Sequence, residues 1–403
     1  MKEEFLPYSK PVFCEKEVEA VSESLRSGWL SMSKKVAEFE EDLASKCKVK
    51  HALFTSSGTT ALHLALAAID FKEGDYLVTT PMTFVASANA ARYCGGDVLF
   101  ADTLEEYPNI DSKSVENKLL ENSNVKCIMP VHFGGLSCDM QELNKLKEKF
   151  KVRIVEDASH ALGASYITKD GKEFPVGSCE FSDMTIFSLH PVKNITTGEG
   201  GVITTNDTEL YKKLVLLRNH SMQRDSEQWE NKELAFDANG NVNSWYYEVH
   251  QVGFNFRPTE FQGALASAQL QKLDGFIDER RKLASKYTEI FRSQFDENVI
   301  KTLDKEEYHG SAYHLFPILI DFEKLSIDRN ELMKRLSSNG VGTQVHYIPV
   351  HLQPYYSKRY SYKMGDFPNA EKYYSQCLSI PIYPGMREQD MDRVIETLRG
   401  AIG

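Results

Sequence analysis

The chain has 403 residues, of which 41% are hydrophobic and 26% are charged, a composition typical of a globular protein. Its 47 basic and 58 acidic residues give a net charge of −11, and such a chain repels the phosphate backbone of nucleic acids. No stretch reaches the roughly 20 apolar residues that cross a bilayer, and the N-terminus lacks the apolar run of a signal peptide. We therefore expect a cytoplasmic protein without a nucleic acid or membrane partner.

Seven cysteines are scattered along the chain, and no two of them form a Cys-x-x-Cys pair. An odd number without paired spacing argues against a disulfide framework and against a zinc site. We therefore expect reduced thiols, as in proteins of the cytosol, and no metal ion.

Short apolar runs alternate with segments of helical periodicity between about residue 50 and residue 205. Strands are predicted over His51–Thr55, Tyr76–Thr79, Asp97–Ala101, Lys126–Val131, Arg153–Glu156, Met184–Ser188 and Gly201–Thr204. Helices are predicted over Thr60–Ala68, Ser114–Glu121 and Met140–Lys149. This alternation indicates the α/β fold class, with a mostly parallel sheet that helices cover on both faces.

The polar segment 223–250 interrupts this alternation. It contains Asp237-Ala238-Asn239-Gly240-Asn241, a strong turn signal, and shows no clear periodicity. A segment of this length without periodicity is usually functional or a mobile insertion.

The helical pattern returns after residue 250, over Thr259–Leu273 and Phe276–Phe295. The remainder predicts a strand, a helix, a second strand and a closing helix, over Tyr313–Asp321, Arg329–Ser338, Gly342–Tyr347 and Gln389–Leu398. Domains usually hold roughly 100–200 residues. We expect a large α/β domain at 1–275 and a small C-terminal α+β domain at 276–403, which a long helix reaches.

Lys193 lies in a loop that follows the predicted strand Met184–Ser188. A lone lysine in a loop is usually a solvated charge. Here Ser188 lies five residues earlier, and the run Gly198-Glu199-Gly200-Gly201 lets backbone approach a ligand closely. A lysine kept from bulk water has a lowered pKa and can form a Schiff base, which makes Lys193 a candidate catalytic residue.

Asp157 stands at the carboxyl end of a predicted buried strand, where α/β proteins bind their ligands. Taken alone, it would more often cap the segment that follows. Together with Lys193 it indicates pyridoxal 5′-phosphate (PLP), which needs a carboxylate at its pyridine nitrogen so that the ring can take up electrons. His160, three residues on, either packs on that ring or supports the edge of the cofactor, although an isolated histidine is more often structural.

Hydroxyl side chains gather where another predicted strand gives way to a helix, at Ser57-Gly58-Thr59. The amide groups of a helix start together with such hydroxyls suit the phosphate of the cofactor, although serine and threonine also simply cap helices. Phe84 follows the next strand and either stacks on the pyridine ring or belongs to the core. The chain contains no H-E-x-x-H, G-x-S-x-G or G-x-x-x-x-G-K-[ST] motif.

These segments together resemble the DegT-type sugar aminotransferases, which are PLP enzymes of fold type I that act on nucleotide-linked keto sugars. The resemblance rests on four motifs, namely Ser57-Gly58-Thr59, Asp157 with His160, Ser188-Leu189-His190-Pro191-Val192-Lys193 and Asn255-Phe256-Arg257. It runs from about residue 8 to the C-terminus. Leu189 departs from the family, which usually has phenylalanine there, and this change leaves the chemistry intact.

The resemblance implies a homodimer with shared active sites, in which Asn255 reaches the PLP phosphate of the partner subunit and Arg257 lies nearby. It also implies contacts with the nucleotide sugar from Tyr8, Trp29, Leu30, Ser31, Gln344, His346 and Tyr347. From the residues alone, Trp29 and His346 would be assigned to the core.

Within the family, the likeness extends to the UDP-sugar C4 aminotransferases of pseudaminic acid synthesis, through segments such as Ile195-Thr196-Thr197 and Gln344-Val345-His346-Tyr347. It implies amination of UDP-2-acetamido-2,6-dideoxy-β-L-arabino-hex-4-ulose. Another UDP-, dTDP- or GDP-4-keto sugar is the alternative, since the segment 223–250 is expected near the substrate entrance and bears on which sugar is accepted.

The implied reaction is ping-pong. L-glutamate gives up its amino group and leaves as 2-oxoglutarate, with pyridoxamine 5′-phosphate as the intermediate form, and the keto sugar then receives the nitrogen. Related sugar dehydratases carry histidine at the Schiff-base position, so Lys193 argues against that activity. A PLP-binding sensor without catalysis is the remaining rival.

Overall fold

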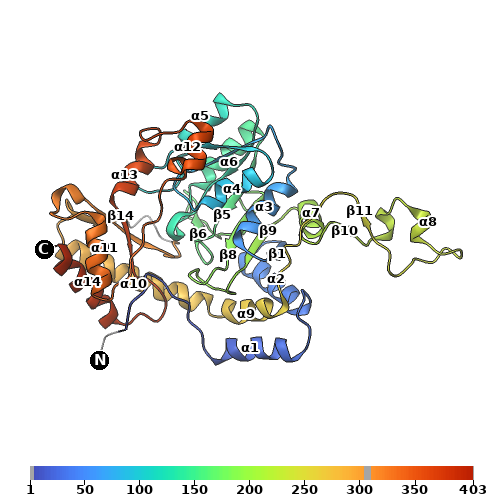
Figure 1. Ribbon diagram of the computed structural model, residues 1–403, viewed down its shortest axis with the longest axis horizontal. Coiled ribbons are helices and arrows are strands. Elements are labelled where there is room, and N and C mark those ends of the chain that lie inside the picture. Colours follow the sequence, from blue (N-terminus) through green and yellow to red (C-terminus); the bar gives the residue numbers. More distant parts are fainter. Residues whose placement is uncertain (1–3, 304–309, 403) are drawn as a thin grey trace.

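The computed structural model describes residues 4–303 and 310–402 (Figure 1). Its centre is a seven-stranded sheet in the order β1-β9-β8-β5-β4-β2-β3. These strands are β1 (His51–Thr55), β2 (Tyr76–Thr79), β3 (Asp97–Phe100), β4 (Val125–Met129), β5 (Arg153–Asp157), β8 (Met184–Ser188) and β9 (Gly201–Thr205). Within this sheet, the neighbouring strands β8, β5, β4, β2 and β3 run parallel to one another. Strand β9 is antiparallel to both of its neighbours, β8 and β1. The prediction of a mostly parallel sheet is confirmed.

Neighbouring residues of the central strands enter two different cores, because successive side chains of a strand point to opposite faces. Val78, Ile128 and Ile154 join one core, whereas Leu77 and Val155 join the other. The first is covered by α2 (Lys34–Cys47), α5 (Ser112–Glu121) and α6 (Met140–Phe150); the second by α3 (Gly58–Ala68), α4 (Val85–Tyr93) and α7 (Thr208–Arg218). Burial on both faces explains the continuous apolar runs in the sequence.

Helix α1 (Glu15–Arg26) packs against α9 (Glu260–Leu270) with its polar side inward (Figure 1). Glu17 is 2% exposed and accepts a hydrogen bond of 2.7 Å from Gln269 Nε2. Val18 and Leu25 face outward and are more than half exposed. This polarity is the reverse of that expected for a surface helix.

The C-terminal part forms a three-stranded antiparallel sheet in the order β12-β13-β14. Its elements are β12 (Ile300–Thr302), β13 (Phe316–Ile320), α11 (Arg329–Ser338), α12 (Pro354–Tyr360), α13 (Pro368–Gln376), β14 (Cys377–Ile380) and α14 (Glu388–Ile402). A separate core joins Leu283, Tyr287 and Phe291 of α10 (Leu273–Gln294) to this sheet. Further residues of this part, including Tyr356 and Tyr373, pack against the large sheet and α4. The domain boundary expected at residue 275 stays a prediction.

The predicted strand Gly342–Tyr347 is wrong. Only isolated bridges form there, from Val341 to Leu6 and from Gln344 to Ser379. Beyond Gln344 the backbone leaves the sheet and carries Tyr347 to His160, with 3.0 Å between Tyr347 Oη and His160 Nε2.

Residues 222–252 form an arm that extends away from the sheet (Figure 1). It contains β10 (Met222–Gln223), α8 (Lys232–Ala235) and β11 (Glu248–Val249), with β10 and β11 paired at its base. The expectation that this segment lies near the substrate entrance stays a prediction. Among the residues described, no helix has both the length and the apolar character needed to cross a membrane.

Candidate active site

Asp157 lies at the carboxyl edge of the large sheet as the last residue of β5, and it is 5% exposed. Ser87 Oγ donates to its Oδ2 at 2.6 Å, and the Ser159 amide donates to its Oδ1 at 3.1 Å. Thr83 Oγ1 lies 2.7 Å from Ser87 Oγ. Each carboxylate oxygen therefore has a donor that fixes its direction.

Lys193 lies in the loop between β8 and β9, and as a residue it is half-buried. The loop is held by its own side chains, since Asn194 Nδ2 donates to Leu162 O at 2.8 Å and Thr196 Oγ1 donates to Leu189 O at 2.9 Å. Desolvation lowers the pKa of Lys193 to about 8, while the charge of Asp157 acts in the opposite direction. A lysine with such a pKa is a nucleophile and a proton carrier near neutral pH.

Gly201 at the end of this loop and Gly58 at the start of α3 allow two segments of the chain to approach each other closely. A Cβ on Gly201 would lie 2.2 Å from Ser57 O, and one on Gly58 would lie 2.9 Å from Ser188 Cβ. That the glycine run also lets backbone approach a ligand stays a prediction. These contacts bring the start of α3 beside the end of β8, where Ser57 Oγ accepts the Thr60 amide at 3.1 Å.

The amides of Gly58 and Thr59 stand in the first turn of α3, where backbone N–H groups have no partner within the helix. Gly58 is buried and Thr59 is half-buried. Such a helix start suits a phosphate.

His160 is buried, and the Gly134 amide donates to its Nδ1 at 3.3 Å. Its proton therefore sits on Nε2, which donates to Tyr347 Oη. Burial lowers the pKa of His160 well below its usual range, and the nearby Lys193 charge adds to this effect. The imidazole is neutral and fixed in orientation.

Two more buried histidines lie beside this group. The ring of His314, which sequence reasoning missed, lies 4.5 Å from that of His160, and its Nδ1 is buried without a hydrogen-bond partner in the described part of the chain. Burial lowers the pKa of His346 to about 3, and its Nδ1 lies 2.8 Å from Ser379 Oγ. The Tyr8 ring lies 5.4 Å from His346.

Phe84 is 58% exposed, and its ring centre lies 6.2 Å from that of Tyr347. The alternative that it belongs to the core is therefore wrong, and its face is available to a planar ligand. Trp29 is 71% exposed, which also contradicts a core position, whereas His346 is buried as a core residue would be.

The remaining predicted residues contact other segments of the chain. Leu30 O accepts the Glu260 amide at 3.0 Å and Ser31 pairs with Thr259, so the Trp29–Ser31 turn is tied to the start of α9. Asn255 is exposed and pairs with Asn219, whose side chain also accepts a hydrogen bond from Arg257. Gln344 is exposed beside β14.

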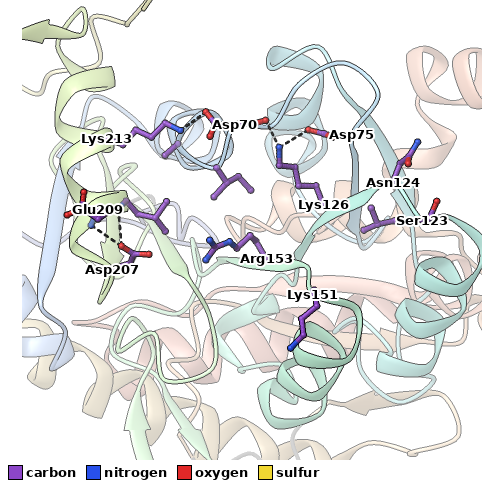
Figure 2. A pocket seen from close by; sticks show the side chains of 14 residues that line it. Asp70, Asp75, Ser123, Asn124, Lys126, Lys151, Arg153, Asp207, Glu209 and Lys213 are labelled. Carbon is purple, nitrogen blue, oxygen red and sulfur yellow. Dashed lines mark hydrogen bonds and ion pairs between the residues drawn. The ribbon is translucent and has the colours of Figure 1, made fainter. Parts of the chain in front are cut away.

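A hollow of about 730 Å³ lies at the opposite edge of the sheet (Figure 2). It is lined by residues at the amino ends of β2, β4 and β5, including Asp75, Val125 and Arg153. Its cations are paired with acids, as in Lys126 with Asp75 at 3.1 Å. Ligands of open α/β sheets bind at the carboxyl ends of strands, which favours the Asp157 edge.

The residues at the Asp157 edge fit PLP. Lys193 offers an amine of lowered pKa, Asp157 offers a held carboxylate, Phe84 offers an exposed aromatic face, and the start of α3 offers amides for a phosphate. The fold and this site define a PLP-dependent aminotransferase of fold type I.

The chain matches the DegT/DnrJ/EryC1/StrS aminotransferase family over residues 12–399, and it belongs to this family. The spore coat polysaccharide biosynthesis protein SpsC of Bacillus subtilis (strain 168) is 38% identical over 399 residues, covering 99% of this chain and 97% of that protein. A UDP-4-amino-4,6-dideoxy-N-acetyl-beta-L-altrosamine transaminase of Campylobacter jejuni (serotype O:23/36) is 37% identical over 396 residues, covering 98% and 96%.

Solved structures agree. Helicobacter pylori PseC, an aminotransferase involved in the biosynthesis of pseudoaminic acid, superposes with a TM-score of 0.86 at 30% identity, covering 99% of both chains. The putative sugar aminotransferase Spr1654 from Streptococcus pneumoniae in its PMP form has a TM-score of 0.86 at 26% identity, covering 98% of this chain and 97% of that one. Its PLP form gives 0.85 at 25%, covering 98% of both chains. The predicted family, fold class, enzyme class and cofactor are confirmed.

Proposed function

We propose that this enzyme transfers an amino group from L-glutamate to C4 of a nucleotide-linked 4-keto-6-deoxy sugar. The observation that carries the proposal is the placement of Lys193 and Asp157 at one carboxyl edge, with the pKa of Lys193 lowered to about 8. The first candidate substrate is UDP-2-acetamido-2,6-dideoxy-β-L-arabino-hex-4-ulose, and the product is UDP-4-amino-4,6-dideoxy-N-acetyl-β-L-altrosamine. Likeness to the Campylobacter transaminase and to PseC supports this choice.

The alternative is another UDP-, dTDP- or GDP-4-keto sugar. SpsC is as similar to this chain as the Campylobacter enzyme, and its name refers to spore coat polysaccharide.

When bound, PLP supplies an electron sink that stabilises negative charge beside the transferred nitrogen. Lys193 Nζ would hold the cofactor and, once released, would move the proton from Cα of L-glutamate to C4′ of the cofactor. In the second half-reaction it would move a proton from C4′ to C4 of the sugar. A pKa near 8 suits both directions, since general bases work best near ambient pH. Asp157 keeps a proton on the pyridine nitrogen.

The other roles follow from position and family likeness. The amides of Gly58 and Thr59, with Ser188, would hold the phosphate, and Phe84 and His160 would pack against the ring. We assign the nucleotide sugar to Tyr8, Trp29, Leu30, Ser31, Arg257, Gln344, His346 and Tyr347.

We further propose that the enzyme is a cytoplasmic homodimer in which Asn255 contacts the phosphate in the partner subunit. Three features support this. The apolar side of α1 faces outward at Val18 and Leu25, Trp245 on the arm is 75% exposed, and Asn255 is exposed at the base of that arm. A second copy would cover these apolar surfaces.

The test is incubation of the purified enzyme with L-glutamate and a panel of UDP-, dTDP- and GDP-4-keto sugars, with products identified by mass and NMR. We expect the C4-amino UDP sugar and stoichiometric 2-oxoglutarate, and no turnover for Lys193→Ala. Reaction only with dTDP or GDP sugars would overturn the choice of sugar. Full activity of Lys193→Ala would overturn the mechanism. A cofactor absorbance band that L-glutamate does not change would identify a non-catalytic sensor.

A further inference from the structure

Two carboxylates follow one another at the end of β5 and point to opposite faces of the sheet. Asp157 faces the site, whereas Glu156 is fully buried behind it. Four donors surround Glu156. Oε2 accepts from His132 Nε2 at 2.5 Å and from the Tyr166 hydroxyl, and Oε1 accepts from the hydroxyls of Thr185 at 2.9 Å and Ser182.

This set of partners determines the ionisation of Glu156. Burial alone would raise its pKa, but the hydrogen bond from His132 and those from the Ser182 and Tyr166 hydroxyls counter burial, and the pKa is lowered. Glu156 is therefore an ionised acceptor whose oxygens are each satisfied twice.

His132 is held at both ring nitrogens. The Cys138 amide donates to Nδ1 at 3.1 Å, so the ring proton sits on Nε2, which donates to Glu156. The backbone amide of His132 donates to Asp157 O at 3.0 Å, and the Asp157 amide donates to Pro130 O at 2.9 Å. The same residue thus contacts the side chain of Glu156 and the main chain of Asp157.

The turn that begins at His132 also reaches the second residue of the site. Phe133–Gly135 forms a short 3-10 turn, and its Gly134 amide donates to Nδ1 of His160. Asp157 and His160, which face the cofactor, are therefore both attached to a turn anchored from behind through His132 and Glu156.

We propose that His132 and Glu156 are positioning residues that hold Asp157 and His160 in place for PLP. Neither touches the site. They act because the buried carboxylate fixes the imidazole, and the imidazole fixes the turn that bonds to both site residues. The inference rests on the roles proposed above for Asp157 and His160.

The test separates the two ring contacts of His132 by substitution. In His132→Asn the side-chain oxygen can still accept the Cys138 amide but is too short to reach Glu156. In His132→Gln the side-chain amide can still donate to Glu156 but leaves the Cys138 amide without its acceptor. The matched control is Tyr166→Phe, which removes the other donor to the same oxygen of Glu156 and leaves His132 unchanged.

Two quantities are measured on each variant, the melting temperature of the apo protein and the Kd for PLP by absorbance titration. All three variants are expected to melt a few degrees lower, since each leaves one buried group with one partner fewer. The Kd for PLP is expected to rise about tenfold or more in His132→Asn only, because the supports of ligand-holding residues carry affinity of this order. It should stay within about threefold of wild type in His132→Gln and Tyr166→Phe.

Equal Kd values in His132→Asn and Tyr166→Phe would overturn the proposal, since His132 would then contribute to stability alone. If His132→Asn does not fold, His132→Gln decides, because it keeps the bond to Glu156, and a tenfold rise of its Kd would overturn the proposal that this bond holds the site. Asp157→Asn is the reference for the site itself. If it leaves the Kd and the cofactor band unchanged, the role assigned to Asp157 fails, independently of His132.

Discussion

The hydroxyl of Ser87 donates a hydrogen bond of 2.6 Å to Oδ2 of Asp157, across 70 residues of sequence. Both residues are buried, so this bond is not exchanged with water. The first turn of α4 therefore sets the direction of the Asp157 carboxylate, which stands at the end of β5.

We expect Ser87→Ala to weaken PLP binding. Hydrogen bonds to charged groups contribute about 1.5–3 kcal/mol, so the Kd should rise roughly tenfold or more. Thr83→Val is the control, since Thr83 contacts Ser87 but has no bond to Asp157. Titration of the apo protein with PLP measures both, and an unchanged Kd in Ser87→Ala would contradict the role of this bond.

The pKa of Lys193 predicts how cofactor attachment depends on pH. Only the neutral amine is nucleophilic, so the attachment rate of PLP to apo protein should rise about tenfold per pH unit and level off near pH 8. The Asp157 charge raises this pKa, and Asp157→Asn should move the midpoint to lower pH. Stopped-flow absorbance between pH 6 and 9 measures both midpoints, and a shift to higher pH would be the wrong sign.

The same lysine should reduce the stability of the apo protein. Its pKa is about 8 in the folded protein and ordinarily 10.5, so the unfolded state binds more protons between these two values and the free energy of unfolding rises with pH there. Below pH 8 the full penalty applies. Allowing for partial exposure, Lys193→Met should raise the free energy of unfolding at pH 7 by about 1–2 kcal/mol. Urea denaturation of the apo proteins tests this, with no difference expected near pH 10.5.

The outward apolar face of α1 predicts an oligomer that charge can disrupt. Val18→Asp combined with Leu25→Asp should shift the assembly towards monomer, since each places a carboxylate in a surface that a second copy would cover. Glu19→Gln on the same helix is the control, because Glu19 is already polar and exposed. Sedimentation equilibrium distinguishes the species, and an unaltered mass in the double variant would place the interface elsewhere.

The glycine of β9 that approaches α3 should not tolerate a side chain. Gly201→Ala places a Cβ 2.2 Å from Ser57 O, and we expect a loss of about 2–4 kcal/mol. Gly275→Ala in α10 meets no atom within 4 Å and should stabilise the protein by up to about 1 kcal/mol. Thermal melts compare the two, and equal effects would contradict the packing argument.

Much of the sheet could be predicted because its strands are buried on both faces. The runs His51–Thr55, Tyr76–Thr79 and Met184–Ser188 end at the predicted residues, since polar and turn residues follow them directly. The segment Gly342–Tyr347 also has a strand-like pattern, but a strand forms only if a distant segment pairs with it. Ser379 pairs with just one of its residues.

The site was predictable where one residue type carries one chemistry, as in Lys193 and Asp157. Ser87 and His314 could not be found in this way. A serine in a helix and a histidine before a strand carry no motif, and their partners Asp157 and His160 come near only when α4 and the segment before β13 pack on the strand ends.

The antiparallel pairing of β9 with β1 also has a kinetic consequence. Thr55 Oγ1 donates to Gly201 O at 3.1 Å, a contact between residues 146 positions apart, and the Lys193 loop enters directly into β9. Contacts of such sequence separation form slowly, because a long loop must close before they contribute any stabilisation. We therefore expect a refolding chain to bind PLP only after β1 and β9, the first and last strands of the large sheet in chain order, have paired.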